Sequence, residues 1–158
     1  VVCRAVATYN AALFLLGTIE GGVAHPQRAR RSDQGNPSEW VSGTAGKDDL
    51  LDTADIIMCA HPLGPYLIVY RESSIVRGEF IGGGGINYFF NPMVQGDGAM
   101  STLALDINND YHVFFGRNSV YIYRGYFGMT SVGDALFHRV FSQNGNLNLH
   151  KSRTVVCK

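Results

Sequence analysis

Short runs of branched and aromatic residues dominate the second half of the chain, and glycine, asparagine, aspartate or proline separates one run from the next. Runs of this kind are typical of β-strands joined by tight turns. We therefore predict strands at 66–71, 75–81, 86–90, 101–107, 111–115, 120–127, 137–141, 147–150 and 154–157. Gly116–Ser119 and the pair Asn144-Gly145 are expected to form turns between neighbouring antiparallel strands.

The first sixty residues follow a different pattern. Alanine and leucine recur through residues 5–16, which is compatible with either a short buried helix or a strand. Residues 48–60 begin with aspartates, which stabilise the N-terminus of a helix, and they end before His61-Pro62, so we predict a helix there. Residues 25–47 are polar and rich in turn-forming residues, which predicts a long exposed loop.

These elements predict a single α+β domain over residues 1–158, with one or two N-terminal helices on a curved antiparallel β-sheet. An all-β propeller or sandwich is the alternative. The composition fits a packed globular domain, because 46% of the residues are hydrophobic and only 16% are charged.

The net charge is zero, since 13 lysines and arginines balance 13 aspartates and glutamates. A basic excess is the usual electrostatic signature of nucleic-acid binding. We therefore expect no DNA partner, and any affinity for RNA would require a local basic patch. The apolar run at residues 11–16 is too short to span a membrane, so we expect no membrane span.

Two of the three cysteines, Cys3 and Cys157, lie near opposite ends of the chain. A disulfide between them would close a loop of almost the whole chain and contribute roughly 4–5 kcal/mol in the chain-entropy model. We predict this disulfide, and with it an oxidising compartment and a secreted protein. Three free thiols are the alternative. Cys59 lies in an apolar run and is expected to be a buried thiol rather than a nucleophile.

A basic cluster, Arg28, Arg30 and Arg31, lies within the predicted exposed loop. Secretory processing proteases cut at clusters of this kind, although a solvated basic patch is the simpler interpretation. If the loop were cut, the predicted disulfide would hold the two resulting chains together.

Three stretches resemble ligand-binding motifs but lack a required feature. Gly82–Gly85 precedes a predicted strand rather than a helix, so we expect a hairpin tip and not a phosphate loop. After residues 43–47, Asp48 stands where a nucleotide-binding loop needs a hydroxyl. The oxygens of Asp106–Asp110 suit calcium, but Tyr111 replaces the required glycine, which favours a surface turn. The five histidines are not at metal-ligand spacing, so we expect no metal and no cofactor.

The C-terminal quarter carries an ordered series of features: the strand at 120–127, a glycine-rich loop, a strand containing Arg139, a turn, a strand ending at His150, and Cys157. This order resembles the C-terminal half of secreted fungal guanyl-preferring ribonucleases and of their non-catalytic relatives, the ribonuclease-like effectors of plant-pathogenic fungi. The resemblance implies RNA cleavage through a 2′,3′-cyclic phosphate, with Arg139 steadying the phosphate and His150 as the general acid. The carboxylate base is missing, since Arg124 stands where the family carries glutamate.

The missing base favours a secreted protein that binds a host protein, a cell-surface protein or RNA without catalysis. Its contact surface would include aromatic and basic side chains near one strand, at least half of the aromatic ones being equally suited to the core: Tyr121, Tyr123, Arg124, Tyr126 and Phe127. The alternative from the same resemblance is an active endoribonuclease in which Glu72 or Glu79 supplies the base.

A second resemblance comes from three triplets that each open an apolar run: Asn10-Ala11-Ala12, Asp55-Ile56-Ile57 and Thr102-Leu103-Ala104. They are spaced by 45 and 47 residues, and Asn146 follows 44 residues later. With cysteines near both ends, this spacing resembles a hemopexin-type propeller, although too few residues follow Asn146 for a fourth blade. The resemblance implies an all-β module that binds carbohydrate or protein.

Overall fold

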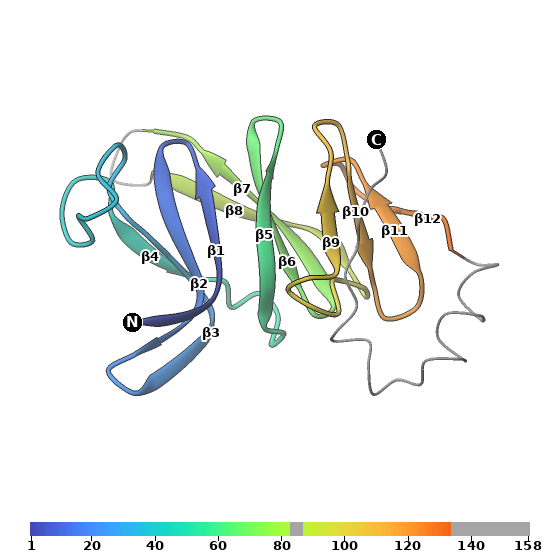
Figure 1. Cartoon of the computed structure of the whole chain (residues 1–158), viewed down its shortest axis with the longest axis horizontal. Helices are drawn as coiled ribbons and strands as arrows, with labels where there is room; N and C mark the ends of the chain where they lie inside the picture. The colour runs from blue at the N-terminus through green and yellow to red at the C-terminus, as the bar shows by residue number, and fades with distance from the viewer. Residues whose placement is uncertain (83–86, 134–158) are drawn as a thin grey trace.

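The computed structural model describes residues 1–82 and 87–133, and every regular element in that part of the chain is a β-strand. The twelve strands form three four-stranded antiparallel sheets, each made of strands that follow one another along the chain (Figure 1). Sheet 1 contains β1 (Val2–Tyr9), β2 (Ala12–Glu20), β3 (Val23–Arg31) and β4 (Gly46–Asp49). Sheet 2 contains β5 (Ile57–Leu63), β6 (Tyr66–Arg71), β7 (Ser74–Phe80) and β8 (Tyr88–Gln95). Sheet 3 contains β9 (Leu105–Ile107), β10 (His112–Phe115), β11 (Val120–Tyr123) and β12 (Thr130–Ser131).

The predicted α+β fold is therefore wrong, and the all-β alternative fits the described part of the chain. Residues 5–9 and 12–16 belong to β1 and β2, with residues 10–11 as the turn between them. The helix predicted at 48–60 is replaced by the end of β4, a linker and the start of β5. The aspartates that suggested a helix N-terminus are instead paired with arginines of neighbouring strands: Asp48 with Arg31, Asp49 with Arg28 and Asp52 with Arg71. These aspartates therefore form ion pairs with distant arginines instead of stabilising the N-terminus of a helix. Residues 1–82 and 87–133 contain no helix that is long and apolar enough to cross a membrane.

Strand predictions for the second half of the chain are confirmed in part within the described residues: β9 covers only 105–107 of the predicted 101–107, β11 only 120–123 of 120–127, and β8 continues to Gln95 beyond the predicted 86–90. β6 coincides with the strand predicted at 66–71, and Gly116–Ser119 joins β10 to β11 as a hairpin. The strands predicted at 137–141, 147–150 and 154–157, and the turn at 144–145, lie outside the described residues, as do 83–86 between β7 and β8.

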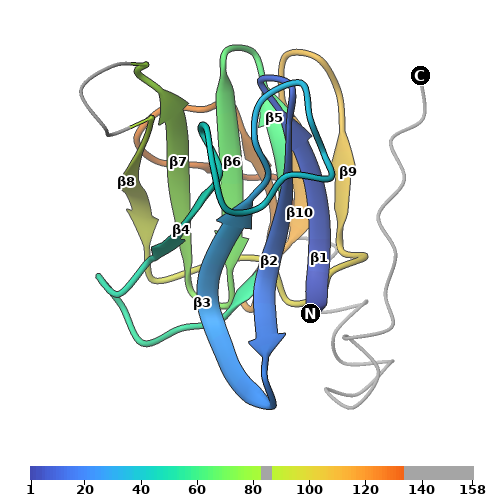
Figure 2. The ribbon, with the colours of Figure 1, turned by 90° about the vertical axis from the view of Figure 1, so that its left-hand side faces the viewer.

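Sheet 2 is the middle layer of the described structure, because sheets 1 and 3 pack against its opposite faces (Figures 1 and 2). Successive residues of a strand point to opposite faces. Leu67 and Val69 of β6 accordingly join the core shared with sheet 1, whereas Ile68 and Tyr70 join the core shared with sheet 3. This double burial explains the unbroken apolar run at 66–70, since a strand covered on both faces shows no polar alternation.

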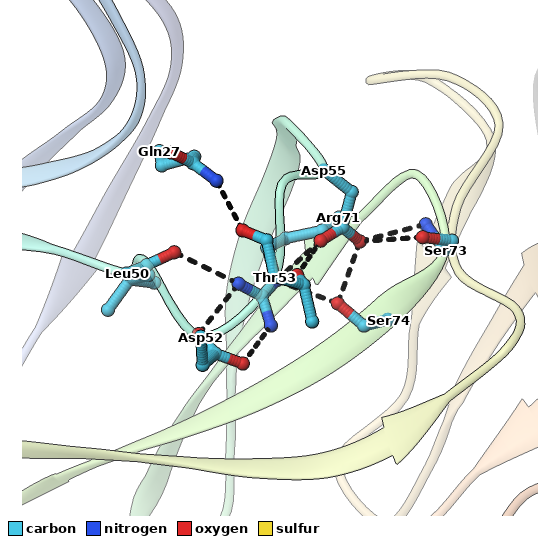
Figure 3. Close-up of polar contacts among 8 residues, drawn as sticks. All are labelled: Gln27, Leu50, Asp52, Thr53, Asp55, Arg71, Ser73 and Ser74. Carbon is cyan, nitrogen blue, oxygen red and sulfur yellow. Dashed lines mark hydrogen bonds and ion pairs between the residues drawn. The ribbon is translucent and has the colours of Figure 1, made fainter.

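An aspartate in each linker between sheets holds a hairpin turn of the sheet that follows. Asp55, just before β5, accepts hydrogen bonds from the Ser73 amide at 3.1 Å and from the Ser74 hydroxyl at 2.8 Å, where β6 turns into β7 (Figure 3). Asp97, ahead of β9, accepts a hydrogen bond of 2.8 Å from the Arg117 amide, where β10 turns into β11. The two linkers therefore repeat one structural device.

The three triplets behind the propeller resemblance do not occupy equivalent positions in their sheets. Asp55-Ile56-Ile57 and Thr102-Leu103-Ala104 lie next to the first strands of sheets 2 and 3. Asn10 and Ala11, by contrast, form the two-residue turn between β1 and β2, and both have positive φ angles, 49° and 58°. Positive φ at both central residues is the geometry of a tight hairpin turn. The spacing of the first two triplets is thus not a structural repeat.

The second linker passes so close to sheet 2 that Gly98 has no room for a side chain. A Cβ atom there would lie 2.0 Å from the Arg71 carbonyl oxygen and 2.8 Å from the Ser74 amide nitrogen. We expect Gly98→Ala to lower the free energy of unfolding by about 2 kcal/mol, because both obstacles are backbone atoms of sheet 2. Urea denaturation followed by circular dichroism measures the loss. Gly46→Ala is the control, since its Cβ would meet only the end of the Arg31 side chain; equal losses in the two variants would contradict this account.

Candidate functional site

Of the residues that were predicted for ribonuclease chemistry, only the two glutamates lie in the part of the chain that the structure describes. Glu72 lies in the turn between β6 and β7, Glu79 lies in β7, and both side chains are half-buried. Arg139 and His150 lie outside the described residues. Residues 1–82 and 87–133 therefore do not assemble the catalytic set, and the ribonuclease roles stay predictions.

The predicted contact surface near β11 divides between core and solvent. Tyr123 is fully buried, and Tyr121 is half-buried with its hydroxyl hydrogen-bonded to a linker aspartate at 2.7 Å. Tyr126 and Phe127 are 72% and 77% exposed, in the loop between β11 and β12, and Arg124 beside them is also exposed. Only this loop, residues 124–129, presents those side chains to a partner.

The basic cluster of β3 is not an exposed loop. Arg28 makes two hydrogen bonds of 2.7 Å to Asp49, and Arg31 pairs with Asp48. Both arginines are less than a tenth exposed, and β3 is hydrogen-bonded to β2 on one side and β4 on the other. The predicted loop at 25–47 is therefore wrong over residues 25–31, which belong to β3, and over residues 46–47, which begin β4. Neither a cleavage site nor a solvated patch describes Arg28 and Arg31.

The prediction for Cys59 is confirmed, whereas the predicted disulfide between Cys3 and Cys157 is not supported. Cys59 is buried among apolar residues of sheet 2, and burial raises the pKa of its thiol to about 12, as expected for a core thiol. Cys3 is a free, half-buried thiol, and Cys157 lies outside the described residues. The structure gives no support to the predicted disulfide.

The surface turn predicted at Asp106–Asp110 is confirmed only over residues 108–110, because Asp106 and Ile107 are the last two residues of β9. Among residues 1–82 and 87–133, no three histidine, cysteine, aspartate or glutamate side chains come together in a way that could hold a metal ion.

A groove of about 280 Å³ lies on sheet 1, where the loop joining β3 to β4 passes the ends of β2 and β3. That loop, residues 32–45, projects at the left-hand end of the molecule in Figure 1. We call the cavity the Trp40 groove, and its lining residues are Glu20, Arg30, Trp40, Val41, Ala45, Gly46 and Lys47.

The aromatic wall of the groove is Trp40, the single tryptophan of the chain, and its indole is partly exposed. The guanidinium carbon of Arg30 lies 5.8 Å from the centre of the indole ring, within the range of a cation–π interaction. Arg30 is also held in place by Glu20, because its Nη1 donates a hydrogen bond of 3.0 Å to that carboxylate. Glu20 also accepts one of 2.9 Å from the Thr18 hydroxyl. The polar wall is thus fixed before any ligand arrives.

Two carboxylates inside the loop fix its backbone. Glu39 accepts hydrogen bonds from the amides of Val41 and Ser42, at 2.8 and 2.9 Å. Asp33 accepts two more from Thr44, from its amide at 2.7 Å and its hydroxyl at 2.8 Å. These backbone hydrogen bonds lower the pKa of both carboxyls, so the acceptors stay ionised near neutral pH. The indole therefore stands on a loop that is tied at two points.

Glu20 also remains ionised. Burial raises the pKa of its carboxyl, but the hydrogen bond from Thr18 and the charges of Arg30 and Arg28 outweigh burial and lower the pKa overall. The groove consequently offers a carboxylate acceptor and cationic donors side by side next to an aromatic plane.

Sequence reasoning missed this site because Trp40 follows the basic cluster in a stretch interpreted as an exposed loop. One signal was present: a tryptophan lies in a stretch that is otherwise mostly glycine, serine, asparagine and glutamate. Its neighbours in the groove come from three strands, β2, β3 and β4, and from the same loop, and spacing along the chain does not show this arrangement.

No family model and no curated protein matches this chain.

Proposed function

We propose that this chain is an all-β binding module that recognises a saccharide in the Trp40 groove. The observation that carries the proposal is the position of the single tryptophan, partly exposed beside an arginine and a glutamate that are hydrogen-bonded to each other. A sugar ring has an apolar face and an edge of hydroxyls, so it is bound by an aromatic plane together with charged hydrogen-bond partners beside that plane. The groove supplies both.

The size and rigidity of the groove suit a ligand of this class. Its volume of about 280 Å³ is near the lower end of the range for small-molecule sites, which fits one sugar ring at a time. The hydrogen bonds of Glu39 and Asp33 order the loop in advance. A preordered loop loses less conformational entropy on binding, which favours a ligand that offers little contact area.

A protein partner at the loop of residues 124–129 is the second candidate. Tyr126 and Phe127 are largely exposed there, and Arg124 lies beside them around a groove of about 240 Å³. Aromatic side chains and arginine are enriched in protein interfaces. The ribonuclease and effector interpretations have less support, since the α+β fold is absent from the described residues and Cys3 is a free thiol.

Trp40→Ala is expected to weaken saccharide binding by at least about tenfold, because truncating a central aromatic hot spot typically costs about 2 kcal/mol or more and about 1.4 kcal/mol already corresponds to tenfold. The measurement is binding of the whole chain to a panel of immobilised neutral and acidic oligosaccharides, followed by affinity determination for the best ligand.

Tyr126→Ala is the matched control, an exposed aromatic residue removed from the other loop. It should leave saccharide affinity unchanged, and circular dichroism should show the same β-structure in both variants. If no member of the panel binds the wild-type chain, or if Trp40→Ala binds as well as wild type, the proposed function is wrong.

A further inference from the structure

Two cations face each other beside the indole. β3 and β4 are paired so that Arg30 lies directly opposite Lys47, while Arg28 lies directly opposite Asp49. Directly opposed residues of antiparallel strands have Cβ atoms about 4.5–5.5 Å apart, and like charges at such positions destabilise the pairing. The Arg28–Asp49 pair is neutralised by two hydrogen bonds. The Arg30–Lys47 pair is a like-charge pair at the edge of the groove.

The carboxylates near the groove do not neutralise this second pair. Glu20 is shared, since it lies 3.0 Å from Arg30 and 3.5 Å from Arg28. Asp49 is taken up by Arg28. Among the residues that line the groove, the two cations Arg30 and Lys47 face the single carboxylate of Glu20, and Lys47 is exposed and has no ion-pair partner among residues 1–82 and 87–133. The Glu39 carboxylate on the adjoining loop accepts hydrogen bonds from the amides of Val41 and Ser42. The groove carries one positive charge in excess, although the whole chain has no net charge.

We infer that the Trp40 groove selects an anionic saccharide, one that carries a carboxylate or a sulfate, whose charged group lies between Lys47 and Arg30 while its ring stacks on Trp40. The inference rests on the proposed saccharide-binding function and adds the charge of the ligand. An anion at this position relieves the repulsion between the two cations, which a neutral sugar does not. A carboxylate and a sulfate offer the same acceptor chemistry to a guanidinium and an ammonium group. The experiment below therefore compares a carboxylated with a sulfated saccharide.

Calorimetric titration of the whole chain with three oligosaccharides of equal length tests the inference: one neutral, one carboxylated and one sulfated. We expect the better of the two anionic ligands to bind about tenfold more tightly than the neutral one, because one additional hydrogen bond between charged groups is formed. That advantage should shrink when the salt concentration rises from 50 mM to about 500 mM, since the site is at the surface.

Lys47→Gln should remove most of the anionic advantage, measured within that variant as the ratio of its affinities for the anionic and the neutral ligand. Arg117→Gln, an exposed cation in the turn between β10 and β11, is the matched control and should change neither affinity.

Equal affinity for neutral and anionic ligands, or an unchanged preference in Lys47→Gln, would overturn the inference while leaving the proposed function intact. Binding of an inorganic polyphosphate as tightly as the anionic saccharide, insensitive to Trp40→Ala, would also overturn it, because charge alone would then explain the binding. Absence of binding to all three oligosaccharides would instead refute the proposed function.

Discussion

Replacing Arg71 by methionine is expected to lower the free energy of unfolding by about 3–5 kcal/mol. The Arg71 side chain is fully buried at the end of β6. Its guanidinium donates hydrogen bonds of 2.9 and 2.7 Å to Asp52, one of 3.1 Å to the Leu50 carbonyl and one of 2.7 Å to the Ser74 hydroxyl (Figure 3). Methionine fills part of the volume but leaves these acceptors without a donor. Because the Asp52 side chain is about one-third exposed, water replaces some of the loss, and we expect the lower end of the range.

Urea denaturation of the wild type and of three variants measures this effect. Arg71→Lys keeps the charge but not the planar two-pronged geometry, so it should lose more than half as much stability as Arg71→Met. Arg117→Met removes an exposed arginine from a turn and should stay within about 0.5 kcal/mol of wild type. A loss below about 1 kcal/mol in Arg71→Met would show that this arginine does not hold the linker between sheets 1 and 2.

Acidification from pH 7.5 to 5 is expected to destabilise the protein through His112. The ring is fully buried in sheet 3, and burial, the largest cause, lowers its pKa from 6.5 to about 4. Nε2 donates to the Pro62 carbonyl at 3.1 Å, so Nδ1 accepts the hydrogen bond from the Tyr70 hydroxyl at 2.9 Å. Burial also raises the pKa of Tyr70 well above 10, which keeps that donor protonated. The nearby His61 ring, 6.4 Å away between centres, has its own pKa lowered by burial.

The sign follows from the depressed pKa. The unfolded chain takes up a proton near pH 6.5 and the folded chain only near pH 4, so the contribution of neutral His112 is complete above pH 6.5 and is lost as the pH falls towards 4. The total is about 3 kcal/mol, of which about 2 kcal/mol is lost by pH 5, before most carboxylates titrate.

Free energies of unfolding measured at half-unit pH intervals test this expectation. His112→Gln should be less stable than wild type at pH 7.5 but should show a much flatter pH dependence, the remaining slope coming from His61. A full wild-type slope in His112→Gln would contradict the assignment.

Local sequence pattern was sufficient for β6, β7 and β10, whose bounds agree with the predicted strands to within one residue at each end. The run at 66–71 is bounded by turn-forming residues and can be recognised without knowledge of its neighbours. The turn at Gly116–Ser119 is equally local. Such elements are set by residues adjacent in the chain, so a sequence shows them directly.

The errors arose where distant residues decide the structure. The aspartates after residue 47 resembled a helix start, but their partners Arg28, Arg31 and Arg71 lie on other strands. The ion pairs of Arg28 and Arg31 also explain why the predicted exposed basic loop is instead a strand in which these two arginines are buried. The Trp40 groove was missed for the same reason, because its walls come from separate strands and a loop. Charge pairing across strands is invisible to any pattern that considers one segment at a time.

The intrinsic fluorescence of the chain is the most direct test of the central claim, because Trp40 is the only tryptophan and therefore the only source of indole emission. Titration with an anionic oligosaccharide should produce a saturable change in emission intensity or wavelength, with a midpoint equal to the calorimetric dissociation constant. An emission spectrum that stays constant while calorimetry detects saturable binding would place the ligand elsewhere on the molecule and contradict the account.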